Sequence, residues 1–267
     1  TSTHRAFRNF PAPRRQPESP PMQLSPRQRS LHLLTLLTAI TLLATLHSTS
    51  PLTAASNTHT DEKSAPAKKS PERWEPDVQK LEQALNKRSP ATADVVFIGS
   101  STIRLWKLTQ SFPNLNAVNH GFGGSQLADS VHFFDRLVTP AKPHTIVLYA
   151  GDNDLSAGKS PETVFRDFQL FLNKAQQLPG CRKVVFLGIK PSIKRWAIHD
   201  KAIKTNQLVS ELCKSHPLAI FVDTWPAGLN PKGEPSKDLL ADDDLHLNDN
   251  GYKIWNSLLQ TALDSSP

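Results

Sequence analysis

Residues 94–99 read DVVFIG, in which a short apolar run follows Asp94 and ends in glycine, and two serines come directly after it. Similar runs recur along the chain; they read TIVLY at 145–149, KVVFLG at 183–188 and LAIFV at 218–222, and we expect a shorter strand at 116–118, which reads NAV. Runs of this length and composition are typical of strands that are buried on both faces of a sheet.

The segments between these runs carry apolar residues at helical spacing. Residues 161–178 are the clearest case, because Pro161 can open a helix and Val164, Phe168 and Phe171 recur on one face. We also expect helices from Pro76 to Leu85 and over 126–137, 198–214 and 249–263. Buried strands that alternate with helices predict an α/β fold in which helices cover both faces of a parallel sheet.

The positive charge of the chain is concentrated near its start. The 267 residues carry a formal net charge of +7, but residues 1–55 alone contain six arginines and one glutamate. The rest of the chain holds 25 of the 31 basic and 23 of the 24 acidic side chains, so it is nearly neutral. A broad basic face for phosphate backbones is therefore not expected, and we predict no nucleic-acid partner.

The cysteine content is low. Cys181 and Cys213 are the two cysteines of the chain, too few for a disulfide-rich scaffold or an all-cysteine zinc site. The sequence leaves one bridge between them open, and two unpaired, buried thiols are the interpretation that we favour.

Residues 33–46 read LLTLLTAITLLATL and have the features of a secretory signal. As a helix this run would cover about 21 Å, short of the ~30 Å hydrocarbon core of a bilayer. Basic residues precede it, and small residues follow at 53–56. We predict that residues 1–55 are an upstream segment and signal peptide cleaved after Ala55, and hence that the protein is exported to the periplasm or secreted. An uncleaved membrane anchor is the alternative; in the mature form we expect no stable membrane span.

Residues 56–73 are polar and charged, and they contain two prolines. Such a segment cannot bury enough apolar area to offset the entropy of ordering the chain. We therefore predict a disordered linker over 56–73 and a single folded domain over 74–267.

Side chains suited to catalysis follow the predicted strands at the points where the strands end. Gly99-Ser100-Ser101 follows the first strand, residues 119–124 follow the second, and Gly151-Asp152-Asn153-Asp154 follows the third. Residues 242–246 (DDDLH) come just before the last helix. Ligands of open α/β sheets bind at the carboxyl ends of the strands. The four segments together supply a nucleophile, oxyanion donors, a base and a carboxylate to orient it, which are the parts that acyl transfer needs.

These four segments, in their order and spacing over residues 94–257, resemble the motif blocks of the SGNH (GDSL-like) hydrolases. The resemblance implies a three-layer α/β/α sandwich with a parallel, flavodoxin-like sheet. It implies a catalytic triad of Ser101, Asp243 and His246, and an oxyanion hole formed by Ser101, Gly124 and Asn153. Ser100 is a departure, because it stands where the first block usually has Asp, and it is an alternative nucleophile.

The roles in the triad also follow from elementary chemistry. A serine hydroxyl such as that of Ser101 is a weak nucleophile until a base removes its proton, and histidine titrates near working pH. Asp243, three residues before His246, can reach the second ring nitrogen and fix the tautomer. The resemblance implies that the substrates are carboxylic esters. We therefore predict a serine-dependent ester hydrolase that forms an acyl-enzyme and requires neither a cofactor nor a metal.

The substrate is less well defined by the sequence. We expect a small-molecule ester with a short acyl chain or an acetyl group, since no long apolar lid segment is visible. Trp106 and Trp196 are predicted to line the pocket. Lys190 and Arg195 lie after the third long apolar run, where they either bind an anionic group or form solvated surface. The oligomeric state is not predicted.

Two other classes of function compete with ester hydrolysis. Asp152, Asp154, Asp243 and His246 are residue types that could hold divalent ions in a metal-dependent phosphoesterase, although their spacing matches no paired metal site. A non-catalytic carbohydrate-binding domain could instead use tryptophans as stacking platforms, namely Trp106, Trp196, Trp225 and Trp255.

Overall fold

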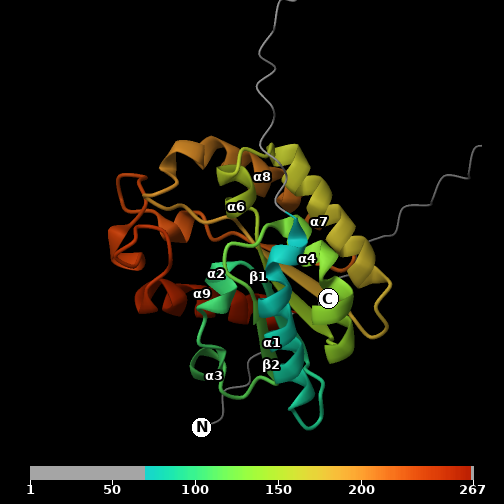
Figure 1. Cartoon of the computed structure of the whole chain (residues 1–267). Coiled ribbons are helices and arrows are strands. Elements are labelled where there is room, and N and C mark those ends of the chain that lie inside the picture. Colours follow the sequence, from blue (N-terminus) through green and yellow to red (C-terminus); the bar gives the residue numbers. More distant parts are fainter. Residues whose placement is uncertain (1–69, 266–267) are drawn as a thin grey trace, which may run out of the picture. The chain divides into compact units, whose positions relative to one another are not determined.

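The computed structural model describes residues 70–265 (Figure 1). The predicted signal peptide with its cleavage after Ala55, and residues 56–69 of the predicted linker, lie outside the described residues. Within residues 70–265, no helix is both long enough and apolar enough to span a membrane. Residues 71–73, which we assigned to the linker, form the short 3-10 helix η2 (Pro71–Trp74) with Trp74. Arg73 of this turn binds Asp129 at 2.9 Å, which explains why the fold begins before the predicted boundary.

The core of the fold is a parallel sheet of five strands. They are β1 (Val95–Gly99), β2 (Ala117–Gly121), β3 (Thr145–Tyr149), β4 (Lys183–Leu187) and β5 (Ala219–Val222). Their spatial order is β2-β1-β3-β4-β5, and every neighbouring pair is parallel. This is the order of flavodoxin-like sheets, so the predicted fold class is confirmed.

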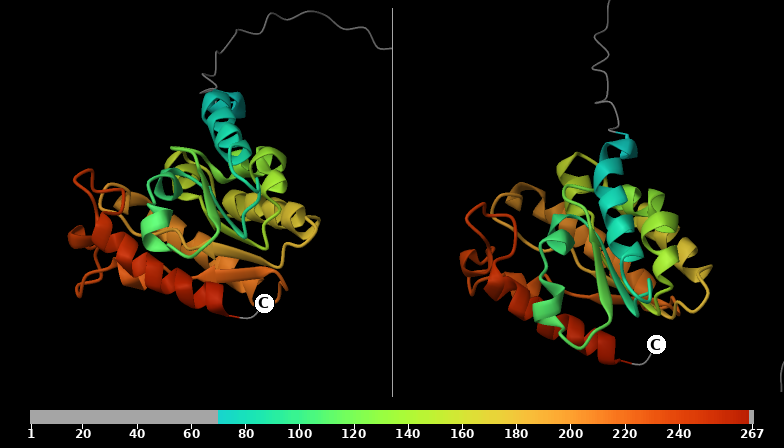
Figure 2. Two further views of the ribbon diagram at one scale, coloured as in Figure 1. Left: turned by 90° about the horizontal axis from the view of Figure 1, so that it is seen from below. Right: turned by 60° about the horizontal axis from the view of Figure 1, so that its bottom comes forward.

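Helices cover both faces of the sheet, as the two views of Figure 2 show. On one face pack α1 (Glu75–Asn86), α4 (Leu127–His132), α5 (Phe134–Leu137), α7 (Pro161–Gln176) and α8 (His199–Cys213). On the other face pack α2 (Ser101–Arg104), α3 (Leu108–Ser111) and α9 (Asp249–Asp264). Short connecting turns are α6 (Asp152–Ser156), η3 (Thr139–Ala141), η4 (Trp196–Ile198), η5 (Pro226–Gly228) and η6 (Lys237–Leu239).

Alternate side chains of each strand enter different cores. In β1, Val96 and Ile98 join the core beneath α7, whereas Val95 and Phe97 join the core beneath α9. All four are at most 4% exposed. A strand that is apolar on both faces in this way has no polar alternation, which is why the continuous apolar runs marked the central strands.

Two elements differ from their predicted limits. The helix expected over 126–137 is interrupted at Phe133, and both Phe133 and Phe134 are 1% exposed. In a regular helix, successive side chains point about 100° apart, so two neighbouring rings do not both face the core. The break at Phe133 allows both rings to be buried. Strand β2 runs on to Gly121, because Asn119 and Gly121 stay paired with β1 although they are not apolar. Cys181 and Cys213 are unpaired and partly buried.

Candidate active site

The end of β1 places two consecutive serines in different surroundings. Gly99 has a φ of +137°, and a Cβ there would lie 2.0 Å from the backbone oxygen of Tyr149, so this turn requires glycine. Ser100 is fully buried and its hydroxyl has no hydrogen-bond partner among the described residues. Ser101 is the first residue of α2 and lines an open cleft. The structure therefore favours Ser101 over Ser100 as the reactive hydroxyl.

Ser101, His246 and Asp243 form a continuous chain of contacts. The Oγ of Ser101 lies 2.8 Å from Nε2 of His246, and Nδ1 of His246 lies 2.5 Å from Oδ2 of Asp243. The contact between Ser101 and His246 joins residues that are 145 positions apart in the sequence. This is the geometry of a serine nucleophile, its general base and the carboxylate that orients the base.

The turn that carries His246 holds Asp243 as an anion. Partial burial acts to raise the pKa of Asp243, but hydrogen bonds from the backbone N–H and ring of His246 and from the backbone N–H of Leu245 outweigh it and lower that pKa. The two backbone bonds measure 2.9 and 3.0 Å, and both reach Oδ1, which leaves Oδ2 for the imidazole. Asp243 is therefore ionised at neutral pH and can stabilise an imidazolium.

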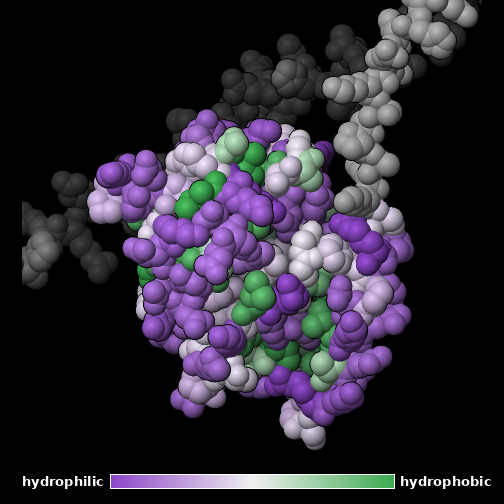
Figure 3. All heavy atoms as spheres, turned by 60° about the vertical axis from the view of Figure 1, so that its left-hand side comes forward, coloured by the Kyte–Doolittle hydropathy of each residue, from purple (hydrophilic) through white to green (hydrophobic). Residues whose placement is uncertain are grey.

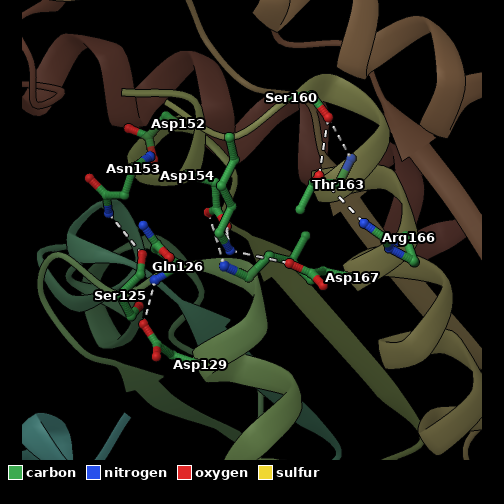
Figure 4. A network of polar contacts seen from close by, with 12 residues as sticks. Ser125, Gln126, Asp129, Asp152, Asn153, Asp154, Ser160, Thr163, Arg166 and Asp167 are labelled. Carbon is green, nitrogen blue, oxygen red and sulfur yellow. Dashed lines mark hydrogen bonds and ion pairs between the residues drawn. The ribbon is translucent and has the colours of Figure 1, made fainter. Parts of the chain in front are cut away.

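The predicted oxyanion donors lie in the same cleft as Ser101 and His246. Gly124 has a φ of +79°, a conformation that glycine adopts readily. Asn153 is the second residue of α6, and its Nδ2 donates a 2.8 Å hydrogen bond to the backbone oxygen of Ser125 (Figure 4). The cleft has a volume of about 430 Å³, which suits a small-molecule ligand.

Sequence reasoning missed two charged residues of this cleft. Asp77 reaches it from α1, and Arg104 from the helix that carries Ser101. The side chain of Arg104 makes no hydrogen bond or ion pair within residues 70–265, and a Cβ on Gly123 would lie 2.9 Å from its Nε. The signal for Arg104 was its position three residues after Ser101, since residues at this spacing share one side of a helix.

Trp106 and Trp196 do not line the cleft around Ser101, in contrast to the prediction. Trp106 is 2% exposed in the core beneath α9, where its ring contacts Trp255, and its Nε1 donates to Asn256 at 2.9 Å. Trp196 lies beside the cleft and stacks on Trp225, with ring centroids 6.1 Å apart. An aromatic ring with a polar edge satisfied inside a core is a structural residue. Burial of Trp106 and Trp255 also removes them from any carbohydrate-stacking platform.

The carboxylates considered for a metal site each have another partner. Asp154 is fully buried, binds Lys159 at 2.7 Å and accepts a hydrogen bond from the backbone N–H of Leu127 (Figure 4). Burial raises the pKa of Asp154, and Lys159 opposes that rise. Asp152 binds Arg195 at 2.6 Å. Within residues 70–265 no three His, Cys, Asp or Glu side chains gather in a group that could hold a metal ion.

Solved structures with the same fold include three whose likeness covers most of both chains. A GDSL-like lipase from Bacteroides thetaiotaomicron has a TM-score of 0.59 and 19% identity over 73% of this chain and 97% of its own. A protein from Streptococcus pneumonia, provisionally described as a platelet activating factor, has a TM-score of 0.64 and 22% identity over 72% and 93%. A catalytic mutant of an acetylxylan esterase from Geobacillus stearothermophilus has a TM-score of 0.52 and 15% identity over 65% and 95%.

No curated protein matches the sequence. The model of the GDSL-like Lipase/Acylhydrolase family matches residues 101–254, which is more than half of the chain. The matched range begins at Ser101 and includes Asp243 and His246. The match and the fold agree with the resemblance found in the motif blocks, and the chain belongs to the GDSL-like lipase/acylhydrolase family.

Proposed function

We propose that the protein hydrolyses carboxylic esters through an acyl-enzyme formed on Ser101. The observation that carries this proposal is the 2.8 Å contact between Oγ of Ser101 and Nε2 of His246, with Asp243 behind the ring. His246 takes the hydroxyl proton as Oγ attacks the ester carbonyl, and it then gives that proton to the departing alcohol. Water attacks the acyl-enzyme in the same way, releasing the carboxylic acid and restoring the serine.

The negative charge that develops on the carbonyl oxygen needs hydrogen-bond donors that are already in place. The backbone N–H groups of Ser101 and Gly124 donate no hydrogen bond within residues 70–265, so both are free to serve. Asn153 uses one hydrogen of its Nδ2 on Ser125 and keeps the other. These three donors are the oxyanion hole of the proposal.

The cleft favours a short acyl group. Its lining is mostly charged, polar or glycine, and Leu245 is its one large apolar side chain among the described residues. Elsewhere on the described surface the exposed large apolar residues are Leu105, Leu170 and Ile193, and on the face in Figure 3 hydrophilic residues surround small separate apolar patches. A long acyl chain would find little apolar area to cover, so we propose acetyl and other short-chain esters. The likeness to an acetylxylan esterase supports acetyl esters in particular.

The test compares Ser101→Ala with Ser100→Ala on p-nitrophenyl esters from two to twelve acyl carbons and on acetylated xylo-oligosaccharides. We expect turnover to fall with chain length, Ser101→Ala to lose at least about 10³-fold in kcat, and Ser100→Ala to retain most activity. An organophosphonate should label Ser101. Full activity of Ser101→Ala, or activity that EDTA abolishes, would overturn the proposal and favour metal-dependent hydrolysis. Sugar binding with no turnover would favour the carbohydrate-binding alternative.

We also propose that this hydrolysis takes place outside the cytoplasm. The support is the signal-like pattern of residues 33–46 and the small residues after it. Mass spectrometry of the protein recovered from cell fractions tests this. A mature N-terminus at or near Ser56 in the exported fraction is expected, and an intact N-terminus in the cytoplasm would contradict it.

A further inference from the structure

Arg195 binds the first two residues of α6, the short helix that follows β3. Its Nη1 donates to Oδ2 of Asp152 at 2.6 Å, and its Nη2 donates to Oδ1 of Asn153 at 2.7 Å. The side chain of Arg195 is 19% exposed and that of Asp152 is 11% exposed. Because the pair is mostly shielded from water, these charge-assisted hydrogen bonds are held more strongly than those of a surface pair.

The two ends of the Asn153 amide therefore meet groups of opposite character. Oδ1 faces the guanidinium of Arg195, which can only donate. Nδ2 faces the backbone oxygen of Ser125, which can only accept (Figure 4). Turning the amide over would place nitrogen against nitrogen and oxygen against oxygen. Arg195 and Ser125 thus fix the one orientation in which Asn153 keeps an N–H for the cleft.

The segment that carries Arg195 also contacts the turn between Asp243 and His246. The backbone N–H of Lys194 donates to the backbone oxygen of Asp244 at 3.0 Å. The Nζ of the buried Lys190 donates to the backbone oxygen of Leu245. One short connection after β4 therefore contacts both the proposed oxyanion amide and the turn that carries the base.

We propose that Arg195 is a positioning residue of the ester hydrolysis, which holds and polarises the Asn153 amide so that its free N–H points at the developing oxyanion. The inference rests on the proposed function. A cation on the amide oxygen draws electron density from the amide and strengthens its N–H as a donor. Asp152 offsets the charge of the arginine and accepts a hydrogen bond from its Nη1, which favours a role on Asn153 over binding of an anionic substrate.

The experiment is a double-mutant cycle between Arg195→Met and Asn153→Ala, measured as kcat and KM on p-nitrophenyl acetate. We expect Arg195→Met to lower kcat by about 10- to 100-fold, somewhat less than loss of an oxyanion donor, with KM nearly unchanged. In the Asn153→Ala background the same change should lower kcat less than about 3-fold, because the group on which it acts is gone. Arg166→Met is the matched control, since this exposed arginine of α7 makes only a 3.5 Å contact with Thr163.

Arg195→Lys provides the conservative variant and the check on folding. It should unfold at nearly the wild-type temperature and restore part of kcat, because an ammonium can still donate to Oδ1 of Asn153. If Arg195→Met fails to fold, the double-mutant cycle is measured with Arg195→Lys instead. We then expect Arg195→Lys to lower kcat in the wild-type background and to leave kcat unchanged in the Asn153→Ala background.

Equal losses of kcat in both backgrounds would overturn the positioning role. So would a rise in KM confined to esters that carry an acidic group, which would make Arg195 a substrate-binding residue. These outcomes are separate from failure of the proposed function. If the proposed function is wrong, Ser101→Ala will remain active. If Ser101→Ala is inactive and Arg195→Met keeps full activity, only the role of Arg195 is rejected.

Discussion

The hydroxyl of Tyr252, on α9, donates a 2.8 Å hydrogen bond to the backbone oxygen of Thr102, in α2. Helix α9 follows the turn that carries His246, and α2 begins with Ser101. The bond therefore links the helix that follows the proposed base to the helix that carries the proposed nucleophile. Tyr252 is 9% exposed, and burial raises its pKa, so it remains a hydrogen-bond donor at any working pH.

Removing this tie should weaken both stability and catalysis. Tyr252→Phe leaves the buried oxygen of Thr102 without its donor, which should lower the free energy of unfolding by about 1–2 kcal/mol in urea titration. We also expect a modest loss of kcat, because α2 and α9 are less firmly held together. A variant of unchanged stability and unchanged kcat would show that the bond does not couple them.

Asn153→Ala should act on the transition state and leave substrate binding largely intact. Loss of its amide donor is expected to lower kcat by about 10²- to 10³-fold on p-nitrophenyl acetate, with little change in KM. Asn173→Ala, on the exposed side of α7, is the control and should match the wild type. A change mainly in KM would mean that Asn153 contacts the bound ester and not the oxyanion.

Gly99 should tolerate no side chain. A Cβ there would meet the backbone oxygen of Tyr149 at 2.0 Å, and neither partner can move without separating β1 from β3. We expect Gly99→Ala to lose more than about 4 kcal/mol of stability or to fail to fold. Gly233→Ala is the matched control: its φ is +81° but no atom lies within 4 Å of the added carbon, so only about 1–2 kcal/mol of backbone strain is expected. Thermal unfolding of the two variants distinguishes the clash from the strain.

Lys190 should make stability rise with pH. Burial lowers its pKa to about 8, with the charge of Arg195 acting in the same direction and the carboxylates of Asp152 and Asp243 acting against it. Between pH 8 and the ordinary lysine pKa of about 10.4, the folded protein releases this proton first, so the unfolded chain binds more protons and the free energy of unfolding increases with pH.

Comparison with Lys190→Met isolates this effect from the tyrosines and cysteines that titrate in the same range. The wild type should gain about 2 kcal/mol over the variant between pH 7 and pH 10, measured by urea denaturation at each pH. A difference that stays constant, or that shrinks as the pH rises, would contradict the lowered pKa.

The sequence predicted most of the fold because the central strands are apolar on both faces. Runs such as 145–149 and 183–188 coincide with β3 and β4 to within one residue. Strand β2 was harder to delimit, since Asn119 and His120 extend it through backbone pairing that no hydropathy pattern records. The break at Phe133 likewise depends on burial of two neighbouring rings, which only the packed core reveals.

The site was predictable where its residues lie close along the chain, and less so where they meet across it. Asp243 and His246 are three residues apart, and the motif blocks marked Ser101, Gly124 and Asn153. Placing Trp106 in the pocket was wrong. Trp106 is close to Ser101 along the chain, but its side chain packs in the core beneath α9, and the sequence does not show this packing. The contact of Arg195 with Asn153 joins residues 42 positions apart and could not be seen before the fold was known.

The parallel register sets Gly99, Gly121 and Tyr149 in one row across β2, β1 and β3. The segments that follow these three residues therefore start from the same level at the carboxyl ends of the strands. The relative placement of Ser101 and Asn153 depends on this register, and so on the number of residues in each strand. Deleting a single residue inside β1 would invert its side chains between the two cores and withdraw the serine from the histidine. We therefore expect insertions in the loops at the opposite ends of these strands to be tolerated better than any change in the length of the strands themselves.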